Sequence, residues 1–199
     1  MLRAILPIVE GVSELASVPV LLRRALAELG AEDIQIARPF KVHRPSVVPK
    51  RELERAIQLG VKQHPNVAGI LVLLDADDDC PAELGPKLLQ RCKAQTHLPV
   101  SVVLAKKEFE GWFLGAKKSL RGKRGIRQDA EAPVDPEDIR GAKEHLAQNM
   151  AAGKYLEVLD QPALAQYMDF AQAREKCPSF DKFWRDLSRL IFEVMKTQQ

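Results

Sequence analysis

The chain has 199 residues, of which 46% are hydrophobic and 29% are charged, with a formal net charge of +3. This length suits one domain with or without an appended segment, and the composition excludes a disordered protein. No apolar run approaches the roughly 20 residues that span a bilayer, so we expect no membrane partner. The three cysteines, Cys80, Cys92 and Cys177, lack CxxC spacing, which favours a reducing, cytoplasmic location and no zinc site.

The first half of the chain alternates between strand and helix patterns. We expect four strands, at residues 4–9, 34–42, 69–75 and 98–105. Helices are expected between them at residues 14–28, 51–63 and 81–94, and a loop at residues 45–49. Ser13 and Gly30 are suited to begin and end the first helix. Pro39 places the second strand at an edge of the sheet, because proline has no amide hydrogen to donate.

Strands that alternate with helices in this way predict an α/β fold with a mostly parallel four-stranded sheet and helices on both faces. After residue 105 the pattern becomes helical, with helices expected at residues 136–150, 156–173 and 180–195. We therefore expect an α/β domain over residues 1–115. Residues 116–199 are expected to form a basic loop and a C-terminal helical region that packs on this domain.

The third strand ends in a dense group of carboxylates. Residues 69–75 form an unbroken apolar run, typical of a strand that is buried on both faces. Four acidic residues follow within five positions: Asp75, Asp77, Asp78 and Asp79. Carboxylates at this density repel one another, and a divalent cation with hard oxygen ligands, Mg²⁺ first, would relieve the repulsion. The alternative is an acidic turn in which Asp79 caps the next helix.

The first strand also ends in carboxylates, at Glu10 and Glu14, with Gly11 allowing a tight turn between them. If the first and third strands are neighbours, these glutamates meet Asp75 and Asp77 at the carboxyl edge of the sheet. That set is sufficient to bind one or two Mg²⁺ or Mn²⁺ ions. The alternative for Glu14 alone is a favourable interaction with the helix dipole.

A further acidic candidate, Glu110, follows the fourth strand at the same edge and is a possible extra ligand. Glu108 competes for that role, because a helix would point the two side chains in different directions. Either glutamate could instead pair with a neighbouring lysine on a solvated face. Trp112 and Phe113 are expected in the core rather than on a base-stacking surface.

One segment is strongly basic and contains no acid. Its six cationic residues are Lys117, Lys118, Arg121, Lys123, Arg124 and Arg127. Two interspersed glycines predict a flexible loop, which could follow a nucleic-acid backbone. A solvated charged loop is the competing interpretation.

Two motifs resemble the Toprim domain of topoisomerases, primases and OLD-type nucleases. These are Glu10-Gly-x-Ser-Glu14 after the first strand and Asp75-x-Asp77 after the third, and the second glutamate is closest to the OLD-type branch. Most of the chain also resembles small bacterial Toprim-like proteins, through the strand end DADDDCP, the segment EGWFLG from Glu110 and the PSF at residues 178–180.

This resemblance implies a Mg²⁺-dependent, DNA-binding nuclease that acts in anti-phage defence beside an ATPase. OLD-type nucleases carry their own ATPase domain, whereas this chain has no Gly-rich Walker loop, so the ATPase would be a separate chain.

The leading hypothesis is a metal-dependent phosphodiesterase acting on nucleic acid. Glu10 would be the general base or first ligand, Asp75 and Asp77 would bind metal, and Glu14 and Asp79 would support a second ion. A phosphatase for small phosphate esters is the second hypothesis, although its aspartate motif normally lies on the first strand. The third is a non-catalytic module that docks on an ATPase through its helical region. The sequence does not determine the oligomeric state, and an oligomer is compatible with it.

Overall fold

The computed structural model describes residues 2–43, 47 and 51–196. Apart from residue 47, the loop expected at residues 45–49 lies outside the described residues. In the described part, one parallel sheet has the order β2-β1-β4-β5, with β3 also paired to β1. The strands are β1 (Ala4–Val9), β2 (Gln35–Ile36), β3 (Phe40–Lys41), β4 (Val67–Asp75) and β5 (Val100–Ala105).

The edge of the sheet differs from the prediction of a single strand over residues 34–42. β2 pairs with the start of β1, where Ala4 lies opposite Gln35, and β3 pairs with its end, where Ile8 lies opposite Phe40. Pro39 lies between the two pairings, where its missing amide hydrogen costs the ladder nothing. The described sheet therefore has five strands instead of four. The predicted edge position of this segment is confirmed.

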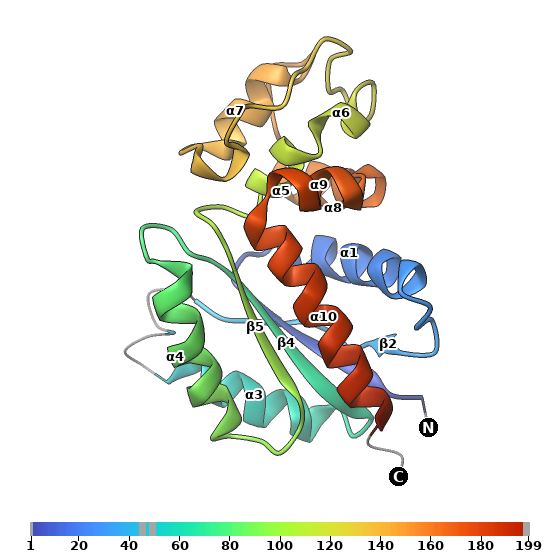
Figure 1. The fold of residues 1–199 in the computed structure, drawn as a ribbon, viewed down its shortest axis with the longest axis vertical. Helices are drawn as coiled ribbons and strands as arrows, with labels where there is room; N and C mark the ends of the chain where they lie inside the picture. The colour runs from blue at the N-terminus through green and yellow to red at the C-terminus, as the bar shows by residue number, and fades with distance from the viewer. Residues whose placement is uncertain (1, 44–46, 48–50, 197–199) are drawn as a thin grey trace.

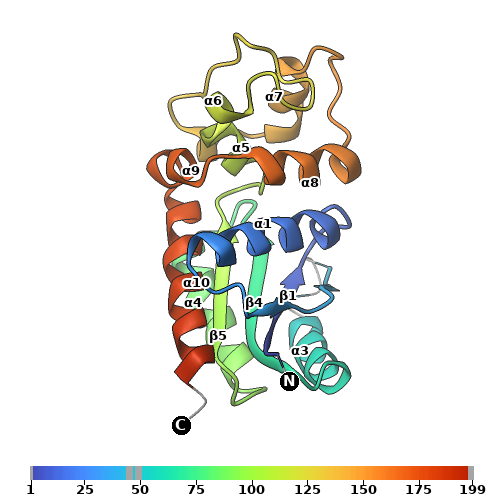
Figure 2. The same cartoon turned by 90° about the vertical axis from the view of Figure 1, so that its right-hand side faces the viewer.

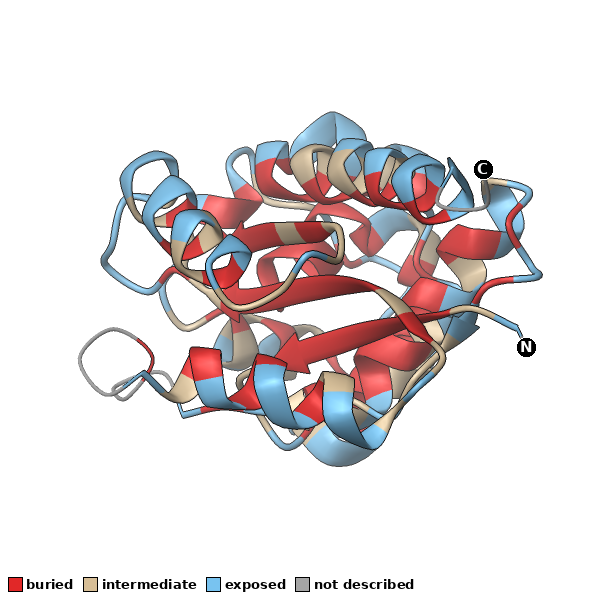
Figure 3. Ribbon diagram, turned by 90° about the horizontal axis from the view of Figure 1, so that it is seen from below, coloured by how far each residue is buried: buried red, intermediate tan, exposed pale blue. Residues whose placement is uncertain are grey.

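Helices cover both faces of the sheet, as predicted for an α/β fold (Figure 1). The helices α1 (Glu14–Glu28) and α10 (Pro178–Lys196) pack on the face that carries Val9, Leu73 and Val103. The helices α3 (Glu52–Gln63) and α4 (Pro81–Lys93) pack on the opposite face. Figure 3 shows the sheet buried between the two layers, with the buried faces of the helices turned toward it.

The remaining helices form what we call the helical cap, at the carboxyl ends of the strands (Figures 1 and 2). They are α5 (Gly111–Gly115), α6 (Lys117–Leu120), η1 (Pro136–Asp138), α7 (Ala142–Asn149), α8 (Glu157–Tyr167) and α9 (Phe170–Lys176). Trp112 and Phe113 are fully buried here, which confirms their predicted place in the core. Trp112 packs against Phe180, with 5.0 Å between ring centroids, and so joins the cap to α10.

One hydrophobic cluster runs from the sheet through the cap to α10. The C-terminal helix therefore lies directly on the sheet, as one of its two covering helices on that face, and the division at residue 115 stays a prediction. In the described part of the chain, no helix combines the length and hydropathy needed to cross a membrane.

Candidate active site

A pocket of 670 Å³ opens at the carboxyl ends of β1 and β4. Its walls come from the loop after β1, the last residue of β4, α7 and the segment that leads into α8. The lining residues are Glu10, Gly11, Val12, Ser13, Glu14, Asp75, Lys143, Tyr155, Leu156, Glu157, Val158 and Leu159. Carboxylates from three segments far apart in the sequence therefore share one pocket.

Glu10 and Asp75 meet because β1 and β4 are hydrogen-bonded neighbours, with Val9 opposite Leu73, which is the condition that the predicted acidic site required. The Asp75 amide lies 3.4 Å from Glu10 Oε2. The Asp75 carboxylate accepts a 2.8 Å hydrogen bond from the amide of Phe109, in the loop after β5. The ends of three elements thus fix the position of the aspartate.

Glu14 is buried at the start of α1 and turns back toward the loop, where the Gly11 amide donates to Glu14 Oε2. A Cβ at position 11 would lie 2.7 Å from that oxygen, so a larger residue there would displace the Glu14 carboxylate from this position. Burial raises the pKa of Glu14. Ser13 precedes the helix as predicted, but its hydroxyl makes no cap and lies 3.5 Å from Glu157 Oε2.

Glu110 lies beneath the pocket and is 1% exposed. Its Oε1 accepts hydrogen bonds from Gln161 Nε2 at 3.0 Å and from the Tyr155 hydroxyl at 3.2 Å. Its Oε2 is buried and has no hydrogen-bond partner among the described residues. Burial raises the pKa of Glu110 to about 7. Glu108 takes a different role, because its Oε1 accepts from the Gly141 and Ala142 amides at the start of α7.

The carboxylates of the pocket act on one another electrostatically. The pKa of Asp75 is raised well above its usual value, first by burial and then by the charges of Glu14, Glu110 and Glu10. Folding thus holds three other acidic groups where each disfavours the ionisation of Asp75. A bound cation would offset this repulsion.

Lys143 brings a positive charge from α7 into this acidic pocket, with Nζ 3.1 Å from Glu157 Oε2. Burial lowers the pKa of Lys143, but the charges of Glu110, Glu157 and Asp75 raise it more, so the net shift is upward. Gln161, which holds Glu110, accepts a 2.6 Å hydrogen bond from Ser17 in α1. The sequence had suggested no role for Tyr155 or Gln161, since no spacing connects them to the strand ends.

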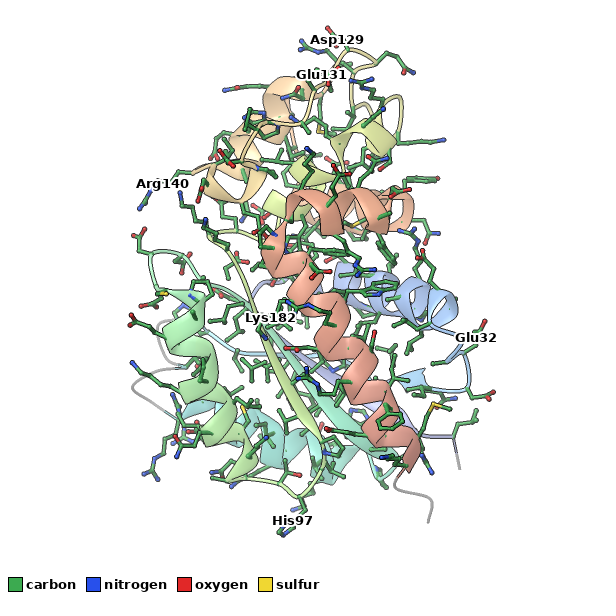
Figure 4. The ribbon with its side chains drawn as sticks, in the orientation of Figure 1. Glu32, His97, Asp129, Glu131, Arg140 and Lys182 are labelled. Atoms are coloured by element: carbon green, nitrogen blue, oxygen red, sulfur yellow. The ribbon has the colours of Figure 1, made fainter. Side chains whose placement is uncertain are left out.

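The other two predicted ligands on the β4 loop lie outside the main pocket. Asp77 has a left-handed backbone (φ 51°), its amide donates to the Lys107 carbonyl at 3.1 Å, and it lines a separate pocket of 190 Å³. Asp78 pairs with Arg140, labelled in Figure 4, at that second pocket. Asp79 is exposed and lines neither pocket, and the N-cap residue of α4 is Cys80, not Asp79 as the alternative interpretation expected.

The basic segment begins as a short helix, α6, where a loop is predicted, and acidic residues partly neutralise its charge. Lys117 lies in α6 and is fully buried, so the expectation that it faces a phosphate backbone is wrong. Lys118 and Lys123 are exposed. The three arginines pair with acids: Arg121 with Glu131, Arg124 with Asp160 and Arg127 with Asp129. Figure 4 shows Asp129 and Glu131 at the far end of the cap from the sheet.

Whether the pocket suits a cation depends on its donor atoms. Among the residues that the structure describes, no three His, Cys, Asp or Glu side chains form a ready-made metal site. The donors present are hard oxygens of Glu10, Glu14 and Asp75, the type that Mg²⁺ and Mn²⁺ prefer. The unsatisfied Oε2 of Glu110 just beneath them is a further oxygen without a partner in the described chain. The donor chemistry fits a divalent cation.

Residues 9–188 match the model of a family described as a domain of unknown function, DUF4276. The matched range contains every pocket residue described above. No curated protein and no solved structure matched the chain. The match assigns no activity, so the resemblance to Toprim nucleases stays a prediction. The chain belongs to the DUF4276 family.

Proposed function

We propose that this protein hydrolyses phosphodiester bonds in nucleic acid with the help of a divalent cation, Mg²⁺ or Mn²⁺. One observation carries the proposal: Glu10, Glu14 and Asp75 line a single pocket at the carboxyl edge of the parallel sheet. Ligands of α/β proteins bind at this edge. The resemblance to Toprim proteins supports the same reaction and adds a separate ATPase and anti-phage defence as parts of the proposal.

The carboxylates of Glu10, Glu14 and Asp75 would hold the cation. When bound, such an ion lowers the pKa of a water molecule and stabilises negative charge on a phosphate. The protein orients two of these ligands through backbone amides, since the Phe109 amide fixes Asp75 and the Gly11 amide fixes Glu14. Preorganised ligands of this kind lose little freedom when they bind an ion.

The positions of Glu10 and Lys143 support two further roles, one of them for a residue that would also hold the cation. Glu10 has intermediate exposure and lines the pocket, so it can accept a proton from an attacking water. Lys143 supplies a positive charge in a pocket whose other charged lining residues are acids, and its contact with Glu157 keeps the ammonium group there. It would attract a phosphate that the carboxylates alone would repel.

The test is a cleavage assay with plasmid DNA and with DNA and RNA oligonucleotides, in Mg²⁺ or Mn²⁺ and in EDTA. Asp75→Asn and Glu10→Gln should each lower the cleavage rate about 100-fold or more, because each removes several kcal/mol of transition-state stabilisation. Glu32→Gln is the matched control. Glu32 is an exposed acid after α1 and lies away from the strand ends in Figure 4.

The assay separates the three hypotheses. Metal-dependent cleavage that the two pocket variants abolish supports a nuclease. Turnover of small phosphate esters alone would instead show a phosphatase. Lack of any turnover, also with a candidate ATPase added, would leave a non-catalytic binding module and refute the proposal.

A further inference from the structure

Four exposed apolar side chains line the acidic pocket together with its carboxylates. Val12, after β1, is 60% exposed, and Leu156, Val158 and Leu159, around the start of α8, are 55%, 60% and 57% exposed. The structure describes ten large hydrophobic side chains that are exposed to this degree, and these four all line one pocket. Apolar side chains gathered in this way mark a binding surface, whereas single scattered ones do not.

Val158 and Leu159 are not needed to attach α8 to the core. The face of α8 that packs toward the core consists of Asp160, Gln161, Leu164 and Ala165, all of them buried. Val158 and Leu159 belong to the same helix but face away from that contact, into the pocket. We call Val12, Leu156, Val158 and Leu159 the apolar rim.

The pocket therefore offers two chemistries to one ligand. Its floor has the carboxylates and Lys143, which suit a phosphate with a divalent cation, and its mouth is aliphatic. At 670 Å³ it falls in the ~300–1,000 Å³ range of pockets that enclose small ligands. A ligand that used both parts would carry a phosphate, held through the proposed cation and Lys143, next to an apolar group.

Resting on the proposed function, we infer that the apolar rim receives the bases of unpaired nucleotides, so that the substrate is single-stranded nucleic acid. In a duplex the bases are stacked inside and the outside is sugar and phosphate, which would leave the apolar rim facing charged groups. In a single strand the base faces are accessible next to the phosphate that enters the pocket. Aliphatic side chains make no hydrogen bonds to base edges, so the preference is for unpaired bases of any sequence.

Rates of cleavage of three labelled substrates of equal length test this inference on the full chain. They are a single strand, the same sequence as a duplex, and a sugar–phosphate chain without bases. We expect the single strand to be cleaved at least about tenfold faster than the other two. The double variant Leu156→Ser and Leu159→Ser should slow cleavage of the single strand about tenfold and leave the chain without bases unchanged.

Leu59→Ser is the matched control, because Leu59 is 50% exposed on α3, on the other side of the sheet. It should leave all three rates unchanged. Thermal unfolding curves of the variants check that each remains folded.

The outcomes separate this inference from the proposed function. Cleavage that does not distinguish the substrates, or that the double variant leaves unchanged, overturns the inference and leaves the nuclease. If no substrate is cleaved, the proposed nuclease activity is refuted. Fluorescence anisotropy then measures binding of the same single strand and tests whether the apolar rim binds bases. Binding that the double variant weakens supports the base site, and no binding overturns it. A double variant that changes only self-association in sedimentation assigns the apolar rim to a protein contact and also overturns it.

Discussion

Lys117 places a charged group in the interior of the helical cap. Its side chain is fully buried, and its Nζ has no hydrogen-bond partner among the described residues. Burial lowers its pKa from 10.5 to about 8. Most of the molecules therefore carry a buried ammonium at neutral pH, and folding has to remove that charge from water.

The variant Lys117→Met keeps the length of the side chain and removes the charge. A pKa lowered from 10.5 to about 8 corresponds to about 3 kcal/mol of unfavourable free energy when the lysine is protonated. Because the buried stem remains packed, the variant should raise the free energy of unfolding near neutral pH by about 1–3 kcal/mol.

The stability advantage of Lys117→Met should depend on pH. Below about pH 8 the folded wild type is protonated and bears the whole penalty, and above pH 10.5 the lysine is neutral in both the folded and the unfolded chain. Between these values the unfolded state binds more protons, so this lysine makes the wild type more stable as pH rises. The advantage of Lys117→Met should therefore shrink over that window.

Urea unfolding followed by circular dichroism, at several pH values from about 7 to about 10, measures both effects. Lys118→Met is the control, since Lys118 is the next residue and is exposed, and it should change stability by less than about 0.5 kcal/mol. A Lys117→Met variant that is less stable than the wild type, or whose advantage stays constant across the window, would refute the reasoning.

Two further predictions concern packing and thiol chemistry. Gly69→Ala should lower the free energy of unfolding by about 1–3 kcal/mol, because the added Cβ would lie 2.6 Å from a methyl carbon of α10. Gly85→Ala in α4 should raise the free energy of unfolding by about 0.5–1 kcal/mol, because its added Cβ would have no heavy atom within 4 Å. Equal urea midpoints for the two variants would contradict this description of the packing. A thiol reagent should modify only the exposed Cys80 in the folded protein, because burial raises the pKa of Cys92 to about 12 and also raises that of Cys177. Rapid labelling of all three cysteines before unfolding would argue against this core.

Local patterns predicted much of the sheet. The unbroken apolar run at residues 69–75 predicts a buried strand, and the structure has one there. Pro39 predicts an edge position because proline cannot donate a backbone hydrogen bond, and the segment lies at the edge. No local sequence pattern predicts that Lys117 is buried. A run of cationic residues does not tell which member enters the core, because that depends on packing between α6 and distant parts of the chain.

The sequence also predicted part of the pocket: the acidic residues at the strand ends, but not the residues from the helical cap. Glu10 and Asp75 could be placed together because the ends of neighbouring parallel strands meet at one edge. Lys143 and Tyr155 reach the same pocket from the helical cap, and no periodicity connects them to the strands. The spacing of Asp77 from Asp75 suggested a shared site, but the left-handed turn at Asp77 leads into a different pocket.

The position of α10 on the sheet has a consequence for synthesis on the ribosome. The strand β5 is finished at Ala105, but the helix that covers β4 and β5 begins only at Pro178. At ~5–20 residues per second, the nascent sheet would wait about 4–15 s for this cover. During that interval one apolar side of the sheet is open to aggregation, and chaperones have their best opportunity to protect the growing polypeptide.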